Sequence, residues 1–220
     1  MVNNLFVYGS LINPLSLSSR LSESGITEEI YDNDIGLCDY YDRSEHIELW
    51  EELHSEGVTV HDVKIDGFRR TYGLKHRDAG MLEVRESKGS YINGIIYEGL
   101  SDELFERVSS SEEGYNVKYL ESSDFEFYGG EVPTFDTDVA CYYPIQGEPS
   151  KINKHEVYHS NILKGFVFLK ENDLVTDFQS FVTDYCETTY EYTDTEWVVL
   201  AKTEPNIVKK LSELNADNLY

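Results

Sequence analysis

A short turn near the start of the chain has the composition of an anion-binding site. Residues 7–11 read Val-Tyr-Gly-Ser-Leu and overlap an apolar run at 5–8 that predicts a short buried strand. Gly9 carries no β-carbon to block a ligand, and the backbone N–H groups of this turn would face outward. Pro14, preceded by Asn13, is typical of a helix start behind its N-cap. The pattern predicts a cradle for a carboxylate or a carbonyl oxygen, although ordinary strand–turn–helix connections share it. The residues concerned are Tyr8, Gly9, Ser10 and Leu11.

Two adjacent carboxylates, Glu112 and Glu113, precede a Gly114-Tyr115 pair. A glutamate acts as a general acid/base near neutral pH when burial raises its pKa above the ordinary value of about 4.3. A glutamate placed after a helix end and before a Gly-Tyr turn would lie at a pocket mouth with one face shielded. Tyr8 and Tyr115 would supply walls, or a hydroxyl that orients a substrate. The alternative is a solvated acidic pair, which is common in a chain this acidic.

A second motif predicts different chemistry. His155, Glu156 and His159 spell H-E-x-x-H within an expected helix, the zinc-binding pattern of many metalloproteases. Two histidines four residues apart share one helix face, and the glutamate would activate a zinc-bound water. The longer form of the motif fails because position 162 is isoleucine. A zinc-dependent hydrolase is therefore the rival hypothesis to a glutamate-based enzyme, and without zinc the two histidines would be surface residues.

The elements that must position these residues alternate between helix and strand. Ser101 is a good N-cap, and the acids that follow it suit the first turn of a helix ending near 109–111. A helix over 154–164 would carry the histidine motif and stop at Gly165. This order, with antiparallel hairpins, predicts an α+β fold with a closed or strongly curved sheet. Other expected strands cover 58–65, 68–74, 81–85, 91–97, 117–127, 139–145 and 197–201, and other helices cover 14–21, 45–54, 173–187 and 204–214.

The charge of the chain excludes two classes of partner. Its 220 residues include 42 acidic and 18 basic ones, which gives a formal net charge of −24. Such a charge repels nucleic acids and anionic membrane surfaces. Because the acids are spread over the whole chain, we interpret them as an adaptation to high salt, where counterions screen self-repulsion. A merely acidic protein is the alternative interpretation.

The cysteines and the N-terminus indicate a cytoplasmic location. Cys38, Cys141 and Cys186 are odd in number and far apart, so they predict neither a disulfide framework nor a C-x-x-C metal site. No signal peptide and no apolar stretch of the length needed to span a membrane is expected from the sequence.

Several stretches resemble, in the same order, motifs of the γ-glutamylcyclotransferase-like family. Residues 8–11 (Tyr-Gly-Ser-Leu) resemble its signature turn, and residues 111–115 (Ser-Glu-Glu-Gly-Tyr) resemble the segment in which an acid precedes a Gly-Tyr pair. Residues 67–72 look like its second-strand motif, and residues 93–100 look like the strand that leads toward the catalytic acid. Pro149-Ser150, Tyr158 and Gly165 match a looser C-terminal pattern.

The resemblance implies a fold, an activity and a site. The fold would be a small mixed β-barrel flanked by helices over 1–170, with 23–62 as a variable acidic region and 171–220 as an extension packed on the same domain. The activity would be release of 5-oxoproline from a small γ-glutamyl substrate, without a cofactor. Counting back from Tyr115 makes Glu112 the general acid/base, whereas counting back from Gly114 makes it Glu113. Tyr8, Gly9, Ser10, Leu11 and Tyr115 would bind the substrate.

A third interpretation keeps this fold without its chemistry. Such a domain would bind a small ligand or a partner protein and leave Glu112 idle. The residues after 170 would then either cover the barrel or mediate formation of a homodimer.

Overall fold

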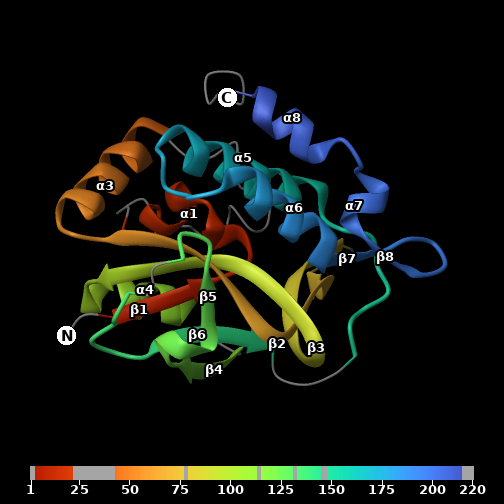
Figure 1. Ribbon diagram of the computed structural model, residues 1–220, viewed down its shortest axis with the longest axis horizontal. Helices are drawn as coiled ribbons and strands as arrows, with labels where there is room; N and C mark the ends of the chain where they lie inside the picture. Colours follow the sequence, from red (N-terminus) through yellow and green to blue (C-terminus); the bar gives the residue numbers. More distant parts are fainter. Residues whose placement is uncertain are drawn as a thin grey trace.

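The computed structural model describes residues 3–21, 43–76, 79–112, 115–130, 133–144 and 148–214. Its centre is a mixed sheet with the strand order β4-β6-β1-β3-β2-β7-β8, and β5 pairs separately with β2 (Figure 1). The α+β class and the flanking helices are as the sequence predicted. The closed barrel is wrong, because β4 and β8 end the sheet without pairing with each other.

Two long strands form the backbone of the sheet. β2 and β3 pair antiparallel from Thr59 opposite Glu98 to His76 opposite Ala79. The shorter strands that the sequence predicted on either side of Gly67 are one strand, because the irregularity there is absorbed as a shift of register. β1 lies between β3, to which it runs antiparallel, and β6, to which it runs parallel. The strands are β1 (Asn3–Val7), β2 (Thr59–His76), β3 (Ala79–Leu100), β4 (Tyr115–Leu120), β5 (Phe125–Phe127), β6 (Val139–Pro144), β7 (Thr189–Tyr192) and β8 (Trp197–Val199).

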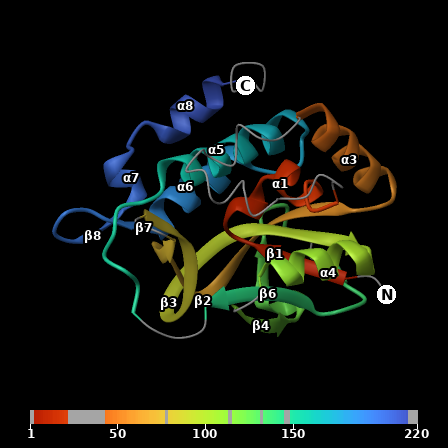
Figure 2. The same cartoon turned by 180° about the vertical axis from the view of Figure 1, so that it is seen from behind.

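Most helices lie together on one side of the sheet. Figure 1 shows α1, α3, α5 and α6 above the long strands, with α8 on the outer side of α5 and α6. α4 lies apart from them, beside β1, as the view from behind also shows (Figure 2). The helices are α1 (Pro14–Ser18), α3 (Arg43–Ser55), α4 (Asp102–Ser111), α5 (Glu156–Glu171), α6 (Phe178–Thr188), α7 (Leu200–Thr203) and α8 (Ile207–Glu213), with 3₁₀ turns η1 (Ser10–Ile12) and η2 (Ser122–Asp124).

Local sequence signals set the starts of the two helices next to the predicted turn and the acidic pair. The side chain of Asn13 caps α1 by accepting from the N–H of Leu15 at 3.1 Å, with Pro14 at the first helical position. Ser101 caps α4 by accepting from the N–H of Leu104 at 3.2 Å, as predicted. α4 consequently ends at Ser111, directly before the first acid of the pair.

Helix α5 continues past the residue that was expected to stop it. A β-carbon at Gly165 would lie 2.6 Å from Cα of Asn13, so this glycine lets α5 pack closely against the N-cap of α1. The predicted stop at Gly165 is therefore wrong, because the glycine serves a helix–helix contact rather than a C-cap. The longer α5 buries Phe166, Val167 and Leu169 in the core.

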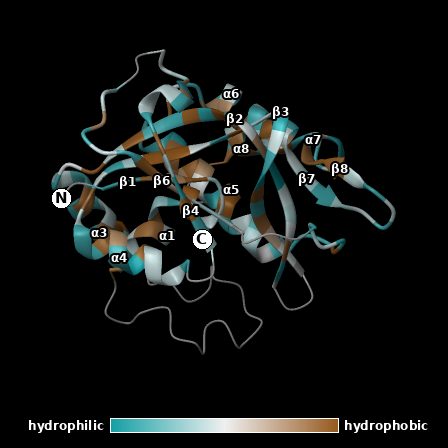
Figure 3. Cartoon of the chain, turned by 90° about the horizontal axis from the view of Figure 1, so that it is seen from below, coloured by the Kyte–Doolittle hydropathy of each residue, from teal (hydrophilic) through white to brown (hydrophobic). Residues whose placement is uncertain are grey.

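The curved sheet has a hydrophobic core on each face. Alternation along β1 sends Leu5 and Val7 to the core that faces the helices, and sends Phe6 to a second core with β5 and β6. Figure 3 shows hydrophobic segments concentrated where β1 and β6 approach the helices. Each large side chain buried in this way stabilises the fold by about 1.5–3 kcal/mol. The two cores fix β1, and with it the turn that follows.

Residues 171–214 contribute to the same sheet and core. β7, a strand that the sequence analysis did not predict, pairs in parallel with β2 at Arg70 and Thr71. Phe181 and Tyr185 of α6 are buried in the helix-facing core. Cys141 and Cys186 are free and buried, whereas Cys38 lies outside the described residues. In the described ranges, no helix has both the length and the apolar character needed to cross a membrane.

Candidate active site

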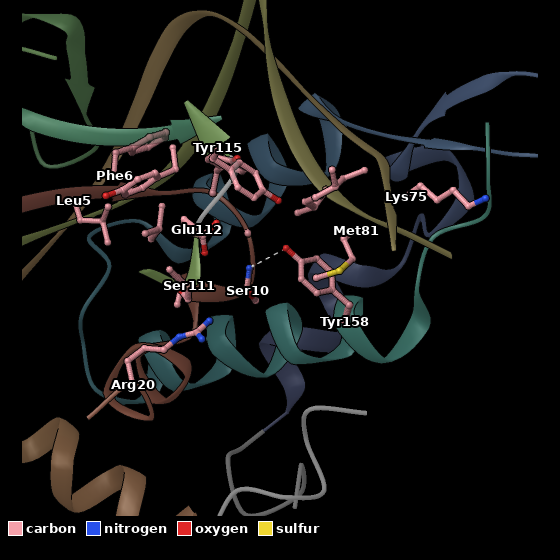
Figure 4. A pocket seen from close by; sticks show the side chains of 17 residues that line it. Leu5, Phe6, Ser10, Arg20, Lys75, Met81, Ser111, Glu112, Tyr115 and Tyr158 are labelled. Atoms are coloured by element: carbon pink, nitrogen blue, oxygen red, sulfur yellow. Dashed lines mark hydrogen bonds between the residues drawn. The ribbon is translucent and has the colours of Figure 1, made fainter. Parts of the chain in front are cut away.

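A cavity of about 400 Å³ opens where β1 ends (Figure 4). Its wall combines the turn after β1, the end of α4, the start of β4, strand β6, the tip of the β2–β3 hairpin and one residue of α5. Predicted site residues from two distant parts of the sequence meet in this cavity. They are Tyr8, Gly9, Ser10, Leu11, Glu112 and Tyr115. Glu113, the alternative acid, lies outside the described residues.

The turn after β1 is held in place from several sides. It forms η1, in which Ile12 N–H donates to the carbonyl of Gly9 at 2.9 Å. The hydroxyl of Tyr97 donates to the carbonyl of Leu11 at 2.9 Å. The N–H of Ser10 donates to the hydroxyl oxygen of Tyr158 at 3.2 Å. The predicted cradle is thus a rigid turn, and one of its N–H groups faces a tyrosine hydroxyl of α5.

Tyr158 explains why the turn contains glycine. A β-carbon at Gly9 would lie 2.6 Å from the hydroxyl oxygen of Tyr158, closer than any side chain tolerates. Burial of Tyr158 and the contact with Ser10 hold its hydroxyl at the cavity wall. Tyr158 belongs to a loose family pattern in the sequence, and that pattern does not predict it as a binding residue.

A fully buried arginine supports the same turn from behind. Arg70 of β2 donates to the carbonyl and the side-chain oxygen of Asn93, at 2.7 and 2.8 Å, and reaches the carbonyl of Tyr8 at 3.5 Å. Its guanidinium lies 4.1 Å from the ring centre of Tyr185. Burial lowers its pKa. Arg70 therefore joins β2, β3 and α6 directly behind the residue that begins the turn, and it has a structural role.

Glu112 is the C-cap residue of α4 and is partly buried at the cavity wall. Its carbonyl accepts from the N–H of Tyr115 at 3.0 Å, which places the acid and the tyrosine on one tight turn. Burial raises the pKa of the Glu112 carboxyl, while the charge of Arg20 and a hydrogen bond from Ser111 act in the opposite direction without cancelling the effect. The carbonyl end of α4 also disfavours an anion there. Glu112 is thus a partly buried carboxyl at the cavity wall with a raised pKa.

Tyrosines and one arginine complete the wall. Burial raises the pKa of Tyr8 well above 10, so its phenol stays protonated and acts only as a neutral hydrogen-bonding group. The hydroxyl of Tyr142 is 2.5 Å from the hydroxyl of Ser109, which joins β6 to α4. Arg20 follows α1 and reaches the same wall as Ser111 (Figure 4). Neither Arg20 nor Tyr142 belongs to a recognisable motif, so the sequence did not predict them as site residues.

The H-E-x-x-H motif has a different environment. His155 precedes α5, and its Nδ1 caps the helix by accepting from the N–H of Tyr158 at 3.2 Å. His159 is buried, which corrects the expectation of a surface residue: its Nδ1 lies 2.6 Å from the Tyr72 hydroxyl and its Nε2 lies 3.1 Å from the Glu204 carboxylate. Among the described residues, no group of three or more His, Cys, Asp or Glu side chains is arranged to hold a metal ion.

Comparisons with known proteins give a likeness to solved structures alone. Neither a protein-family model nor a curated protein matches the sequence. A solved structure titled gamma-glutamyl cyclotransferase is similar at 14% identity over 96% of this chain and 99% of that chain, with a TM-score of 0.47. YkqA from Bacillus subtilis is similar at 15% identity over 80% of this chain and 56% of that chain, with a TM-score of 0.47. The uncharacterized protein loc79017 from Homo sapiens is similar at 14% identity over 94% and 98%, again with a TM-score of 0.47. At these values the likeness carries no argument about activity, which has to come from the pocket itself.

Proposed function

We propose that the chain is a γ-glutamyl cyclotransferase-type enzyme that converts a small γ-glutamyl compound into 5-oxoproline and a free amine. The observation that carries this proposal is the convergence of the turn at 8–11, Glu112 and Tyr115 on one cavity, although about 100 residues separate them in the sequence. The raised pKa of Glu112 supports the same assignment. A cavity of about 400 Å³ suits a ligand of dipeptide size.

Glu112 moves the proton in the proposed reaction. Its carboxylate takes a proton from the substrate's α-ammonium, and the free amine then attacks the γ-carbonyl carbon of the same molecule. A carbon–nitrogen bond closes the five-membered ring while the carbonyl electrons move onto oxygen. Protonated Glu112 gives its proton to the leaving nitrogen, and the bond from carbon to that nitrogen breaks as the carbonyl re-forms. The Glu112 carboxylate then takes the second proton from the ring nitrogen, and the released amine takes up that proton. Both reacting groups belong to one molecule, so the protein mainly has to fold it into the ring-closing conformation.

The turn after β1 and Tyr158 stabilise the charge that develops on the carbonyl oxygen. The hydroxyl of Tyr158 accepts from the N–H of Ser10 at the cavity wall, where it would donate to the oxyanion. These donors are held by buried neighbours, so little reorganisation accompanies the reaction. Tyr8 and Tyr115 form walls that exclude water from the folded substrate.

We also propose that the enzyme works in the cytoplasm at high salt. The net charge of −24 supports this setting, since counterions would screen the repulsion between surface carboxylates.

The test of the function is release of 5-oxoproline, identified by mass, from a panel of γ-glutamyl dipeptides and amines at molar salt. Wild type is assayed with and without a chelator, beside Glu112→Gln, Glu113→Gln and the control Glu106→Gln. Glu106 is an exposed residue of α4, so its substitution removes the same charge from the same helix away from the cavity.

We expect turnover that survives the chelator, is kept by Glu106→Gln and is lost in Glu112→Gln. Loss of turnover in Glu113→Gln alone would assign the role of base to Glu113 instead of Glu112. Turnover lost on chelation would instead support the zinc hypothesis. Absence of turnover on every substrate would contradict the proposal and leave a binding protein.

A further inference from the structure

Among the described residues, one cation that lines the pocket, Arg20, forms no ion pair with a carboxylate. The side chain of Arg20 is half-buried, and its Nε is buried without a hydrogen-bond partner. The nearest carboxylate on this wall is that of Glu112, and the charge of Arg20 acts on it by lowering its pKa without forming an ion pair. Its backbone carbonyl accepts from Arg107 Nη1 at 3.2 Å.

Several other cations of this chain pair with a carboxylate, whereas fully buried Arg70 donates to neutral oxygens and Arg69, whose Nε is also without a hydrogen-bond partner, lies 4.0 Å from the ring centre of Tyr190. Lys64 lies 2.8 Å from Asp184, Arg85 lies 2.8 Å from Glu83, and Lys154 lies 2.7 Å from Glu204. With 42 acidic residues against 18 basic ones, an anion for Arg20 would be easy to supply. Because a half-buried charge without a partner is costly, the vacancy indicates that its counterion comes from a ligand.

The position of Arg20 is fixed by its backbone. Its N–H donates to the carbonyl of Leu17 at 3.0 Å, which continues the turn at the end of α1, and Arg107 of α4 holds its carbonyl. Figure 4 shows the guanidinium directed at the wall formed by Ser111 and Glu112. A cation and a carboxylate thus occupy neighbouring places on one wall without pairing with each other.

We propose that Arg20 binds the α-carboxylate of the substrate while Glu112 faces its α-ammonium, so that the pocket selects the zwitterionic head of a free α-amino acid. The inference rests on the proposed function and deepens it, because it names what the substrate must carry. Both substituents are on one carbon, and the two opposite charges of the wall are complementary to them. Glu112 has to reach the α-nitrogen to act as a base, which places the α-carboxylate next to Arg20. The γ-carbonyl then points toward Ser10 and Tyr158.

The test compares ligands with and without an α-carboxylate. Turnover is measured for a γ-glutamyl dipeptide and for the same compound with an α-carboxamide. Binding is measured separately by calorimetry for L-glutamate and for its α-amide, which have no leaving group. Each ligand is tested on wild type, Arg20→Gln, Arg20→Lys and the control Lys75→Gln. Lys75 also lines the cavity but is directed away from Arg20 (Figure 4), so it controls for loss of positive charge.

We expect wild type and Lys75→Gln to prefer the α-carboxylate by about 10–100-fold in kcat/KM and in Kd. Arg20→Gln should abolish the preference mainly through KM, and Arg20→Lys should restore part of it. Equal thermal unfolding of Arg20→Gln and wild type would show that the loss is local. Turnover with the preference kept in Arg20→Gln would overturn the role of Arg20 and leave the cyclotransferase standing. A binding preference that depends on Arg20, without turnover, would overturn the cyclotransferase and keep the α-carboxylate site. If neither turnover nor a binding preference is found, both the cyclotransferase and the α-carboxylate site are overturned.

Discussion

Two polar regions of this protein each contain a carboxylate, and their environments differ. At the pocket, burial raises the pKa of Glu112, and within the described part of the chain no carboxylate forms an ion pair with Arg20 on the same wall. At the junction of α5 and α7, burial acts in the same direction on Glu204, yet hydrogen bonds from His159 and Lys154 outweigh it and lower the pKa to about 2. Protein partners thus satisfy Glu204, whereas Glu112 faces a cavity. A catalytic or binding site is therefore to be sought where charged groups face a cavity and a ligand can pair with them.

The network around Glu204 is continuous. Lys154 Nζ lies 2.7 Å from Glu204 and 3.0 Å from Glu191, and His159 joins Glu204 to the buried hydroxyl of Tyr72. It connects α5 and α7 with β2 and β7 through side chains that the protein itself supplies. The histidines that spell a zinc motif in the sequence are used for helix capping and for this network.

Substitution of Glu112 should give the largest effect. Glu112→Gln is expected to lower kcat by about 10²–10⁴-fold, the usual contribution of a general acid/base. It should leave the fold intact, because an amide of nearly the same size replaces the carboxylate and can still accept the hydrogen bond from Ser111. Steady-state release of 5-oxoproline measures the effect, with Glu106→Gln as the control. A kcat of Glu112→Gln within a few-fold of wild type would mean that Glu112, like Glu204, is not the catalytic base.

His159→Ala should give the opposite pattern. Removing a buried ring that contacts Tyr72 and Glu204 is expected to lower the free energy of unfolding by about 2–4 kcal/mol. Because His159 does not line the cavity, kcat of the folded fraction should stay within a few-fold of wild type. Urea unfolding and the assay above, run on the same samples, check this. Lost turnover with unchanged stability would place His159 in the catalytic site instead.

The contact between Gly9 and Tyr158 predicts a rescue. Gly9→Ala should cost about 1–3 kcal/mol, because the added methyl group meets the Tyr158 hydroxyl at 2.6 Å. In a Tyr158→Phe background the nearest ring atom is 3.9 Å away, so the same substitution should cost much less. A double-mutant cycle of unfolding free energies measures the coupling. Additive costs would show that the hydroxyl does not constrain the turn.

The smallest effect is a difference in how stability depends on pH. The folded pKa of Glu112 is raised, so its ionisation destabilises the fold above the unfolded value of 4.5. Glu112→Gln should therefore raise Tm slightly at pH 7, and the gain should disappear below pH 4.5. The folded pKa of Glu204 is lowered, so its stabilisation is present above pH 4.5 and is lost as pH falls toward 2. Glu204→Gln should lower Tm at pH 7, with a loss that shrinks in acid. Changes in Tm of the same sign for both variants at pH 7 would contradict this difference between Glu112 and Glu204.

Local signals predicted much of the fold, and contacts across the chain account for the rest. Ser101 and Pro14 mark helix starts by capping chemistry that involves only their neighbours, and the structure has both helices there. Gly165 was misread as a stop, because its packing against Asn13 depends on a residue about 150 positions away. β7 was missed since its pairing with β2 is likewise distant in sequence.

The candidate site also combines residues that local motifs mark with residues that only contacts across the chain bring there. The turn at 8–11, Glu112 and Tyr115 are recognisable because each lies in a compact motif, and the structure brings them to one cavity. Tyr158 and Arg20 reach that cavity from α5 and from the end of α1, and no local pattern marks them. What distinguishes Arg20 is that it lines the cavity while its Nε is buried without a hydrogen-bond partner, which only a structure reveals.

The most direct test is a measurement of the Glu112 pKa in the folded protein. Carbon-13 resonances of labelled glutamate carboxyl groups are followed from pH 3 to 8 at high salt, and Glu112→Gln and Glu204→Gln assign the two signals. We predict that Glu112 titrates above 4.5 while Glu204 stays ionised through most of this range. A Glu112 pKa at or below 4.5 would contradict its assignment as the base and make the two carboxylates alike.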